Sequence, residues 1–409
     1  MSCVIMHGMK TLVRPSVVGP IFFLLSVSAS PLIAQTGTFL DRPVSSDLRV
    51  VTYNVHWDSI FPDDDPNNPP FRSFDKVDEF RRVIVALNPD IMCLQEINGD
   101  RNPQDIADIF DQVLPLSGGQ WQAMIGHSNV IVSRYPLSMM AEHTVPAGQR
   151  AQAMALVDLP NETYLSDIYL INEHYRCCGG VDNDPQRQQQ SDAVVNWMRD
   201  ARSPGEFISL PEDTPIVVLG DFNIVGGPGP LDTLLCGNIS DEGTYGNDSP
   251  PDWDGTCNVD VHPMHNGAGS DDYTWRNDNS NFDPGRLDYI TFSDSLIMAV
   301  HDFVLNTTLM SPSDLNAVGL QQFDVVLNPP GHFDHLPLVV DFRFAQPPII
   351  ADGDVNLDGV TDGRDIAWFA ELLVTGTGDT LRIAHGDYNG SGMIDLGDVS
   401  EFVDGLLSP

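Results

Sequence analysis

The chain is poor in positive charge. Of its 409 residues, 20 are lysine or arginine and 58 are aspartate or glutamate, which gives a formal net charge of −38. Lysine occurs only at Lys10 and Lys76. Such an acidic surface repels polyanions at long range, which excludes capture of nucleic acid or anionic membrane by a generic basic patch. It does not exclude an enzyme that meets phosphate through a bound divalent cation.

Long apolar runs are equally scarce. Hydrophobic residues make up 42% of the chain, enough for a sizeable core and too many for wholesale disorder. One apolar run, residues 17–29, follows a basic start and precedes PLIAQ, so we expect residues 1–34 to be a secretory signal peptide. A membrane anchor is the alternative, but the run is short for a span of ~20 residues and contains Pro20. The mature chain is expected to lack a transmembrane segment and to be secreted or at the cell surface.

Cysteine is rare, and one of the six cysteines lies in the signal segment. The remaining five are an odd number, so at least one is a thiol or pairs with another chain. Cys236 and Cys257 bracket a segment rich in glycine, aspartate and proline and are the expected disulfide. Cys93 lies in an apolar run and is expected to be a buried thiol. Cys177 and Cys178 could be bridged, reduced or split between partners.

Apolar runs and helical periodicity predict one α/β or α+β domain with packed sheets. The expected strands cover residues 48–55, 90–94, 129–133, 153–159, 168–175, 214–220, 287–292 and 336–342. The expected helices cover residues 74–87, 104–114 and 191–201. Residues 224–273 are rich in glycine, proline, aspartate and asparagine, which predicts long loops that carry substrate selection.

Polar residues stand at the ends of these expected strands. An aspartate or asparagine in such a place usually forms a turn, and a lone histidine is usually structural. Together, however, they supply carboxylates for a hard cation, amides for phosphate oxygens and two imidazoles, as metal-assisted phosphoryl chemistry needs. The chain has neither a Gly-x-Ser-x-Gly elbow nor a Walker loop. The candidate residues are Asn54, Glu96, His174, Asp221, Asn223, Asp288, Asp334 and His335.

The motifs around these residues carry a family resemblance. TYNVHW, LQE, SRYPL, NEH, GDFN, RLDYI and DHLPL occur in the order found in the endonuclease/exonuclease/phosphatase superfamily. This deoxyribonuclease-I-like group includes abasic-site endonucleases, neutral sphingomyelinases and inositol polyphosphate 5-phosphatases. The similarity covers roughly residues 45–343, and GDFN with a terminal DH-x-P is its most specific part. It implies that residues 45–345 form a four-layer αββα sandwich, with two packed mixed β-sheets and helices outside.

The resemblance also implies a metal site and a catalytic base. Glu96, with Asn54 beside it, would bind Mg²⁺ (or Mn²⁺), and Asp334 could touch a second metal ion. His335 would be the general base that activates water, polarised by Asp288. A carboxylate bonded to one imidazole nitrogen fixes the tautomer and raises basicity at the other nitrogen, so this pairing is chemically reasonable.

Three further residues are expected to act on the phosphoryl group. Asp221 and Asn223 would position the nucleophile and a phosphate oxygen, and His174 would stabilise charge on the phosphoryl oxygens. None of the departures from the family pattern removes an essential group. These departures are His56 in place of an acidic residue, Glu173 in place of a small hydroxyl residue, and Phe333 in place of serine.

The sequence therefore predicts a divalent-metal-dependent phosphoesterase, a hydrolase acting on phosphate esters. The substrate stays open between nucleic acid, a lipid headgroup and a small phosphodiester. An extracellular nuclease acting on DNA or RNA is the narrower alternative, and a catalytically silent binding protein of the same fold is the competing class.

The C-terminal tail contains an internal repeat. After a proline-containing linker at residues 346–351, GDVNLDGVTDGRD begins at Gly353 and GDYNGSGMIDLGD at Gly386, 33 residues later. Both segments carry oxygen ligands at EF-hand spacing, with glycine where the loop must turn sharply. We expect both loops to bind Ca²⁺. The expected ligands are Asp354, Asn356, Asp358, Asp362 and Asp365 in the first loop and Asp387, Asn389, Ser391, Asp395 and Asp398 in the second.

Each loop runs into an apolar-periodic helix, at residues 366–373 and 399–407. This arrangement resembles a type I dockerin, a duplicated all-α calcium-loop module that binds cohesin domains on scaffolds or cell surfaces. The resemblance spans residues 352–409 and implies a cohesin-like or cell-surface partner.

Overall fold

The computed structural model describes residues 36–67, 75–144, 151–161, 163–203, 208–325, 333–344, 351–376, 380–389, 391 and 393–407. The expected signal peptide and nearly all of the expected linker lie outside these residues. No helix in the described part of the chain is long and apolar enough to cross a membrane.

Two six-stranded sheets form the main domain, and we call them sheet A and sheet B. In spatial order, sheet A consists of β11 (Ile297–Val304), β12 (Leu338–Phe344), β1 (Leu48–Asn54), β2 (Ile91–Gln95), β4 (Asn129–Ser133) and β3 (Gln122–Gly126). Sheet B consists of β5 (Leu137–Thr144), β6 (Ala151–Val157), β7 (Ile168–His174), β8 (Ile216–Asp221), β10 (Asp288–Phe292) and β9 (Val259–Val261). All eight expected strands are present.

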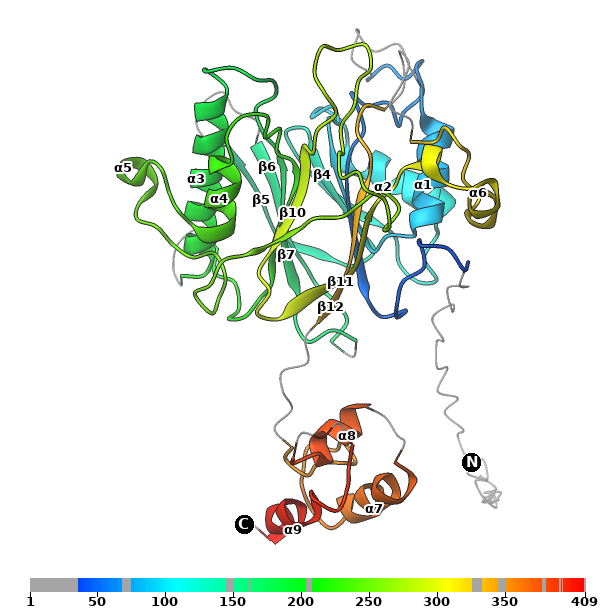
Figure 1. The fold of residues 1–409 in the computed structure, drawn as a ribbon, viewed down its shortest axis with the longest axis vertical. Helices are drawn as coiled ribbons and strands as arrows, with labels where there is room; N and C mark the ends of the chain where they lie inside the picture. Colours follow the sequence, from blue (N-terminus) through cyan, green and yellow to red (C-terminus); the bar gives the residue numbers. More distant parts are fainter. Residues whose placement is uncertain are drawn as a thin grey trace, which may run out of the picture. The chain divides into compact units, whose positions relative to one another are not determined.

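Helices cover the outer faces of the two sheets (Figure 1). On the side of sheet A lie α1 (Val77–Leu87) and α2 (Pro103–Val113), and on the side of sheet B lie α3 (Asp184–Ala201) and α4 (Gly229–Cys236). Inner-face residues of both sheets, such as Leu94 and Leu219, share one buried cluster. The main domain is thus a mixed α/β sandwich with two packed mixed sheets, as the sequence predicts.

Each sheet contains one parallel pair of strands, and the other pairs are antiparallel. In sheet A, β1 and β2 are parallel and α1 connects them, whereas in sheet B, β7 and β8 are parallel and α3 connects them. Parallel neighbours require such a crossover, and their carboxyl ends come out at the same edge of the sheet. Each pair therefore delivers its final residues to one place.

The backbones of β7 and β8 approach closely at Gly220. This glycine has a φ of 134°, and a methyl group there would lie 2.0 Å from the carbonyl oxygen of Glu173. Only glycine combines that conformation with that space. The close approach occurs one residue before His174 and Asp221, so it fixes how near these two side chains come.

Two expectations from the sequence need correction. Helix α3 begins at Asp184 rather than near residue 191. The sequence does not predict its first turns, because they are polar, lack an apolar period and contain a proline. The stretch 224–273 is not all loop. It contains α4, a short helix α5 (Glu242–Tyr245) and the edge strand β9. Two more short helical segments follow β11, namely η1 (Thr307–Leu309) and α6 (Pro312–Val318).

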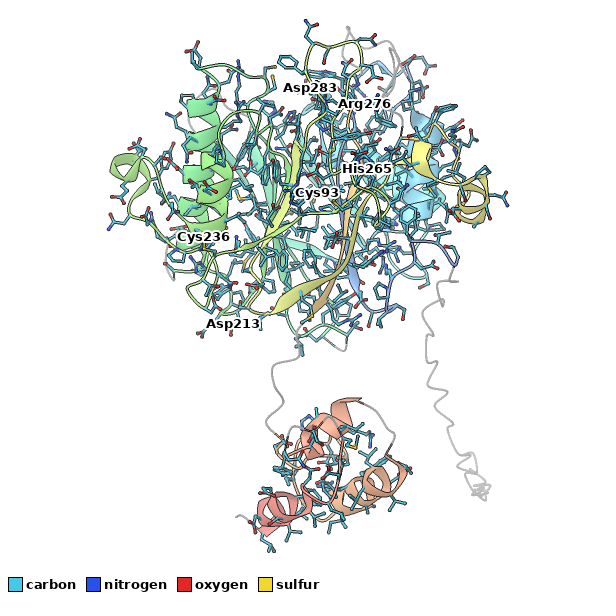
Figure 2. All side chains as sticks on the ribbon, viewed as in Figure 1. Cys93, Asp213, Cys236, His265, Arg276 and Asp283 are labelled. Carbon is cyan, nitrogen blue, oxygen red and sulfur yellow. A yellow bond between two sulfur atoms is a disulfide. The ribbon has the colours of Figure 1, made fainter. Side chains whose placement is uncertain are left out.

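The expected disulfide is confirmed, since Cys236 at the end of α4 is bonded to Cys257 (Figure 2). Cys93 is a buried thiol, as expected.

The disulfide spans 21 residues. Replacing both bridged cysteines by serine should lower the free energy of unfolding by about 3 kcal/mol, because the open loop has more conformational freedom in the unfolded chain. Denaturant unfolding followed by tryptophan fluorescence measures this, and reductant should destabilise the double variant no further. An unchanged unfolding free energy would contradict the prediction.

The C-terminal tail has its own small core. Helices α7 (Asp365–Thr375), α8 (Thr380–Gly386) and α9 (Val399–Leu407) belong to it, and α8 is an addition to the two helices expected. Phe369 and Phe402 stack with ring centroids 3.9 Å apart and planes 4° from parallel. Val355, Leu372 and Ile394 complete the buried cluster.

Candidate active site

The site lies where the two parallel pairs end. Asn54 is in register with Gln95, so Glu96 follows directly beside it, and His174 is in register with Asp221. Figure 2 places Arg276 and Asp283 at the opposite end of the sandwich from Asp213, which precedes β8. The strand ends that carry the site therefore point toward the end where the loop 276–285 lies.

Glu96 is held in place by backbone and amide donors. It adopts a left-handed conformation with a φ of 64°, which turns the chain out of the strand. The Trp57 backbone N–H donates to Glu96 Oε2 at 3.0 Å, and Asn54 Nδ2 lies 3.3 Å from Glu96 Oε1. Asn54 Nδ2 also donates to Asp221 Oδ2 at 3.1 Å. One amide therefore links the acidic groups of the two sheets.

His174 and Asp221 face each other at the end of sheet B. His174 Nε2 lies 3.4 Å from Asp221 Oδ2 and 3.9 Å from Glu96 Oε1. Both His174 and Asp221 are buried. Asn223, with a φ of 50°, donates its backbone N–H to Asp221 Oδ1 at 3.0 Å and its side-chain amide to the Tyr175 carbonyl at 3.4 Å.

His335 and Asp288 form the closest pair in the site. Asp288 opens β10 beside Asp221, with which it is in register. His335 Nδ1 lies 2.7 Å from Asp288 Oδ2, and His335 Nε2 lies 3.6 Å from Asp221 Oδ2. The Thr274 hydroxyl accepts the backbone N–H of Asp288 at 2.9 Å. The imidazole of His335 therefore has Nδ1 bonded to Asp288 and Nε2 turned toward Asp221.

Burial and mutual charge shift the ionisation of this cluster. Burial raises the pKa of Asp221 to about 7; the positive charge of His335 opposes this shift, and Asp288 and Glu96 add to it. Burial alone would lower the pKa of His335, but the neighbouring Asp288 and Asp221 raise that pKa well above its usual value. Burial is thus the main cause of the shift at Asp221, whereas the neighbouring carboxylates cause the shift at His335.

Asp334 sits at the rim, with partners of its own. Its Oδ2 accepts from the Trp275 indole N–H at 3.2 Å, and its Oδ1 lies 3.7 Å from His56 Nδ1. His56, which replaces an acidic residue of the family pattern, is therefore paired with a carboxylate.

The other two departures from the pattern are core residues. Phe333 is buried and its ring lies 5.0 Å from that of Tyr53. Glu173 is buried on the face of β7 opposite His174, because successive residues of a strand alternate. Burial raises the pKa of Glu173 well above the usual value. Neither residue takes a group away from the site.

The donor set fits a divalent cation. Within the described residues, Glu96, Asp221 and Asp288 have no lysine or arginine partner, only histidine and amide neighbours. Asp288 Oδ1 is buried without a hydrogen-bond partner. Uncompensated carboxylates and an open oxygen are what a hard cation requires.

Two overlapping placements of the cation are open within this cluster. Asp221, Asp288 and His335 each offer a ligand atom, all within 4.8 Å of one another. Glu96 offers the other placement, since His335 Nδ1 is already bonded to Asp288 and Glu96 is the more open carboxylate. Mg²⁺ usually keeps several waters, which an open carboxylate accommodates.

The sequence of the main domain matches a known protein family. Residues 51–329 match the model of the Endonuclease/Exonuclease/phosphatase family. The chain belongs to this family. A comparison with curated proteins gives no match at the level of sequence.

Three solved structures that are similar to this family member have low sequence identity to it. D. rerio TDP2, complexed with a single-strand DNA product, is 15% identical, over 73% of this chain and 99% of the other, with a TM-score of 0.44. The human Nocturnin catalytic domain, with bound sulfate, is 16% identical, over 74% and 96%, with a TM-score of 0.43. ANGEL2, a 2′,3′-cyclic phosphatase, is 16% identical, over 73% and 96%, with a TM-score of 0.46. At these identities the substrates of those proteins say nothing about the substrate of this chain.

The structure brings seven of the eight candidate residues of this family member into one connected cluster, with Asp334 at its rim. Sequence reasoning missed the groups that support them. These are the Trp57 backbone N–H, the Thr274 hydroxyl and the Trp275 indole. Trp275 lies 59 residues from Asp334, and no spacing in the sequence connects them.

Proposed function

We propose that this chain is a divalent-cation-dependent phosphoesterase that hydrolyses a phosphate ester by attack of water. The observation that carries the proposal is the Asp288–His335 pair, 2.7 Å apart, with the second imidazole nitrogen turned toward Asp221. Proton transfer by a positioned imidazole is a common source of rate enhancement in hydrolysis.

Each residue of the site has a distinct part in the proposed reaction. Asp288 holds the proton on His335 Nδ1, so Nε2 is the nitrogen that accepts a proton from the attacking water. Asp221 and Asn223 orient the water and one phosphoryl oxygen. His174 donates to a second phosphoryl oxygen and stabilises the charge that develops on it.

Glu96 and Asn54 would bind Mg²⁺ or Mn²⁺, with Asp334 available to a second ion. The bound cation would supply charge neutralisation on the phosphoryl and leaving oxygens. The carboxylate charge that raises the pKa of His335 is also the charge that a cation would offset, which favours the neutral imidazole a base requires.

A substrate panel with and without metal tests the proposal. We expect hydrolysis of at least one of plasmid DNA, RNA, sphingomyelin and bis-p-nitrophenyl phosphate with Mg²⁺ or Mn²⁺, and none after EDTA. Activity that survives EDTA would rule out the metal-dependent mechanism. Hydrolysis of plasmid or RNA alone would identify the narrower alternative, an extracellular nuclease, and inactivity on every ester would favour a silent binding protein.

We propose that the chain is exported. The apolar segment within residues 1–34 supports this, and so does the disulfide between Cys236 and Cys257, since disulfides persist in oxidising compartments. Proteomics of the medium or cell surface, with the mature N-terminus located near residue 34, tests export.

We propose a second function for residues 352–409, a calcium-dependent dockerin-like module. The supporting observation is a repeated hydrogen-bond pattern. In the first loop Asp365 accepts the backbone N–H groups of Asn356 at 2.9 Å and Asp362 at 2.8 Å. In the second loop Asp398 accepts those of the corresponding residues, Asn389 at 2.9 Å and Asp395 at 2.7 Å. The aspartates at the first loop position do the same. Asp354 accepts the backbone N–H of Asp358, and Asp387 accepts that of Ser391. The same backbone-to-carboxylate bonds therefore recur at corresponding positions of the two loops, the positions at which EF-hand-like sites carry their oxygen ligands.

Apolar residues exposed in both repeats support a docking role for this module. Val360 and Met393, 33 residues apart, are 51% and 50% exposed, and Val374 and Leu407, also 33 apart, are 83% and 76% exposed. Exposed apolar groups that recur on a small domain are typical of binding surfaces. The partner we propose is a cohesin-like domain on a scaffold or cell surface.

Removing the last ligand of either loop should abolish one calcium site. In the full chain, Asp365→Ala and Asp398→Ala should each remove one Ca²⁺ binding event in calorimetric titration, and the double variant should lose both. Glu371→Gln, an exposed change on α7 outside the loops, is the control and should titrate as the wild type. A double variant that still binds Ca²⁺ with the wild-type stoichiometry would contradict the calcium module.

A further inference from the structure

Two adjacent cysteines follow β7, the strand that ends at His174. Cys177 and Cys178 come three and four residues after His174, at the carboxyl end of β7. Both carry thiols, and their Sγ atoms are 2.9 Å apart. Cys178 is exposed, and Cys177 is partly exposed. Small-molecule oxidants can therefore reach this pair.

The backbone at the pair is already turned sharply. Cys178 has a φ of 73°, a left-handed conformation that a residue with a side chain seldom adopts. Adjacent Cα atoms are about 3.8 Å apart, less than the roughly 4.4–6.8 Å of ordinary disulfides. A bond between neighbouring cysteines is therefore strained and more easily reduced than an ordinary one.

Side chains from α3 and its N-cap hold the carbonyl groups around the pair. Arg187, a buried residue of α3, donates from Nη1 to the carbonyl oxygens of Arg176 at 2.8 Å and Cys178 at 2.9 Å. Asn183, the N-cap, donates from Nδ2 to the Cys178 carbonyl at 3.3 Å and accepts from Arg176 Nε at 3.1 Å. These bonds hold the carbonyl groups on both sides of the peptide bond that joins the two cysteines.

We propose that Cys177 and Cys178 are a reversible oxidation site, closing to a vicinal disulfide that slows turnover at the neighbouring catalytic centre. The second half of this proposal rests on the proposed function. The link runs through Tyr175, whose carbonyl accepts from Asn223 and whose N–H donates to the Asp221 carbonyl at 2.9 Å. Ring closure turns the backbone two residues away and weakens the hold on Asn223.

The oxidant is a small-molecule disulfide such as oxidised glutathione. The Cys178 thiolate attacks it, forms a mixed disulfide and releases one thiol. The Cys177 thiolate then attacks Cys178 Sγ and releases the second thiol. The protein gives up two protons and two electrons, and the oxidant becomes two thiols, so the exchange balances.

Mass spectrometry after equilibration in glutathione redox buffers tests the site without reference to catalysis. The full-length protein is trapped with N-ethylmaleimide and digested. In oxidising buffer, the peptide containing Cys177 and Cys178 should lack two hydrogen atoms and carry no label. In reducing buffer it should carry two labels. Two labels at every ratio, or two bound glutathiones, would overturn the proposal.

Turnover measured in the same samples tests the regulatory half. We expect a loss of kcat in the oxidised sample that reducing buffer reverses while Cys236–Cys257 remains intact. The Cys177→Ala/Cys178→Ala variant should no longer respond, whereas Cys93→Ala, at a buried site, should respond like the wild type. Equal kcat in both buffers overturns the link to catalysis. An enzyme inactive in both buffers would count against the proposed function instead, and the peptide masses would still decide the oxidation site.

Discussion

Replacing His335 by alanine is expected to lower kcat/KM by roughly 10²–10⁴-fold, the usual contribution of a positioned acid or base. In the proposed mechanism no other imidazole can replace it, because His174 Nε2 faces Asp221 and Glu96 and is assigned to charge stabilisation. Initial rates on the best substrate of the panel measure the loss. The fold should survive, since His335 precedes β12 and the change leaves that strand intact.

A matched histidine tests whether the loss is specific. His301 also bonds a buried aspartate, with its Nδ1 2.9 Å from Asp341 Oδ2, but Asp341 lies in the middle of β12 and is paired with Arg49. His301→Gln should therefore leave the rate near that of the wild type. Asp288→Asn should fall between the two variants, because it keeps the shape of the pair and removes the charge. Near-full activity in His335→Ala would show that His335 is not the base.

Substituting Glu96 by glutamine should raise the Mg²⁺ concentration needed for half-maximal activity by at least about tenfold. Removing a residue that only supports a metal ligand already lowers metal affinity by about this factor, and a direct ligand should matter at least as much. Glutamine keeps the length of the side chain, and its carbonyl oxygen can still accept from the Trp57 N–H. What it loses is the negative charge that a hard cation prefers. Activity measured across a Mg²⁺ titration gives the shift.

Glu212→Gln is the matched control for this titration. Glu212 is exposed and precedes β8, at the end of the strand opposite Asp221. Its titration curve should overlay that of the wild type. Equal thermal unfolding of both variants and the wild type without metal would exclude a folding defect. A Glu96→Gln curve that overlays the wild type would show that another carboxylate, such as Asp221, is the main ligand.

The strands that the sequence predicts and those it misses differ in a physical way. All eight predicted strands are interior to their sheets, whereas the four missed ones are the edges. Interior strands are covered on both faces and paired on both sides, so their sequences are nearly continuous apolar runs. Edge strands are more polar and irregular. The missed strands are β3, with an exposed first residue, β5 and β11, each with an irregular register, and the three-residue β9.

The clustering of the candidate residues was predictable for a related reason. Its residues follow interior strands, which are readable, and parallel pairing gathers their ends. What could not be predicted lies where the chain leaves the strands. His56, Trp57 and Asp58 have φ values of 50°, 54° and 65°, a left-handed run that turns the Trp57 N–H onto Glu96. No residue type in that run requires such a conformation, so composition gives no warning of it.

The tight contact between β7 and β8 at Gly220 has a consequence for attempts to change what this enzyme acts on. Mutant libraries built to alter substrate choice usually randomise positions near the reacting groups. Position 220 qualifies by proximity, yet any side chain there would meet the Glu173 carbonyl and spread the two strands that present His174 and Asp221. Libraries that keep this glycine constant and vary the loop 276–285 would sample new substrates while preserving the spacing of His174 and Asp221.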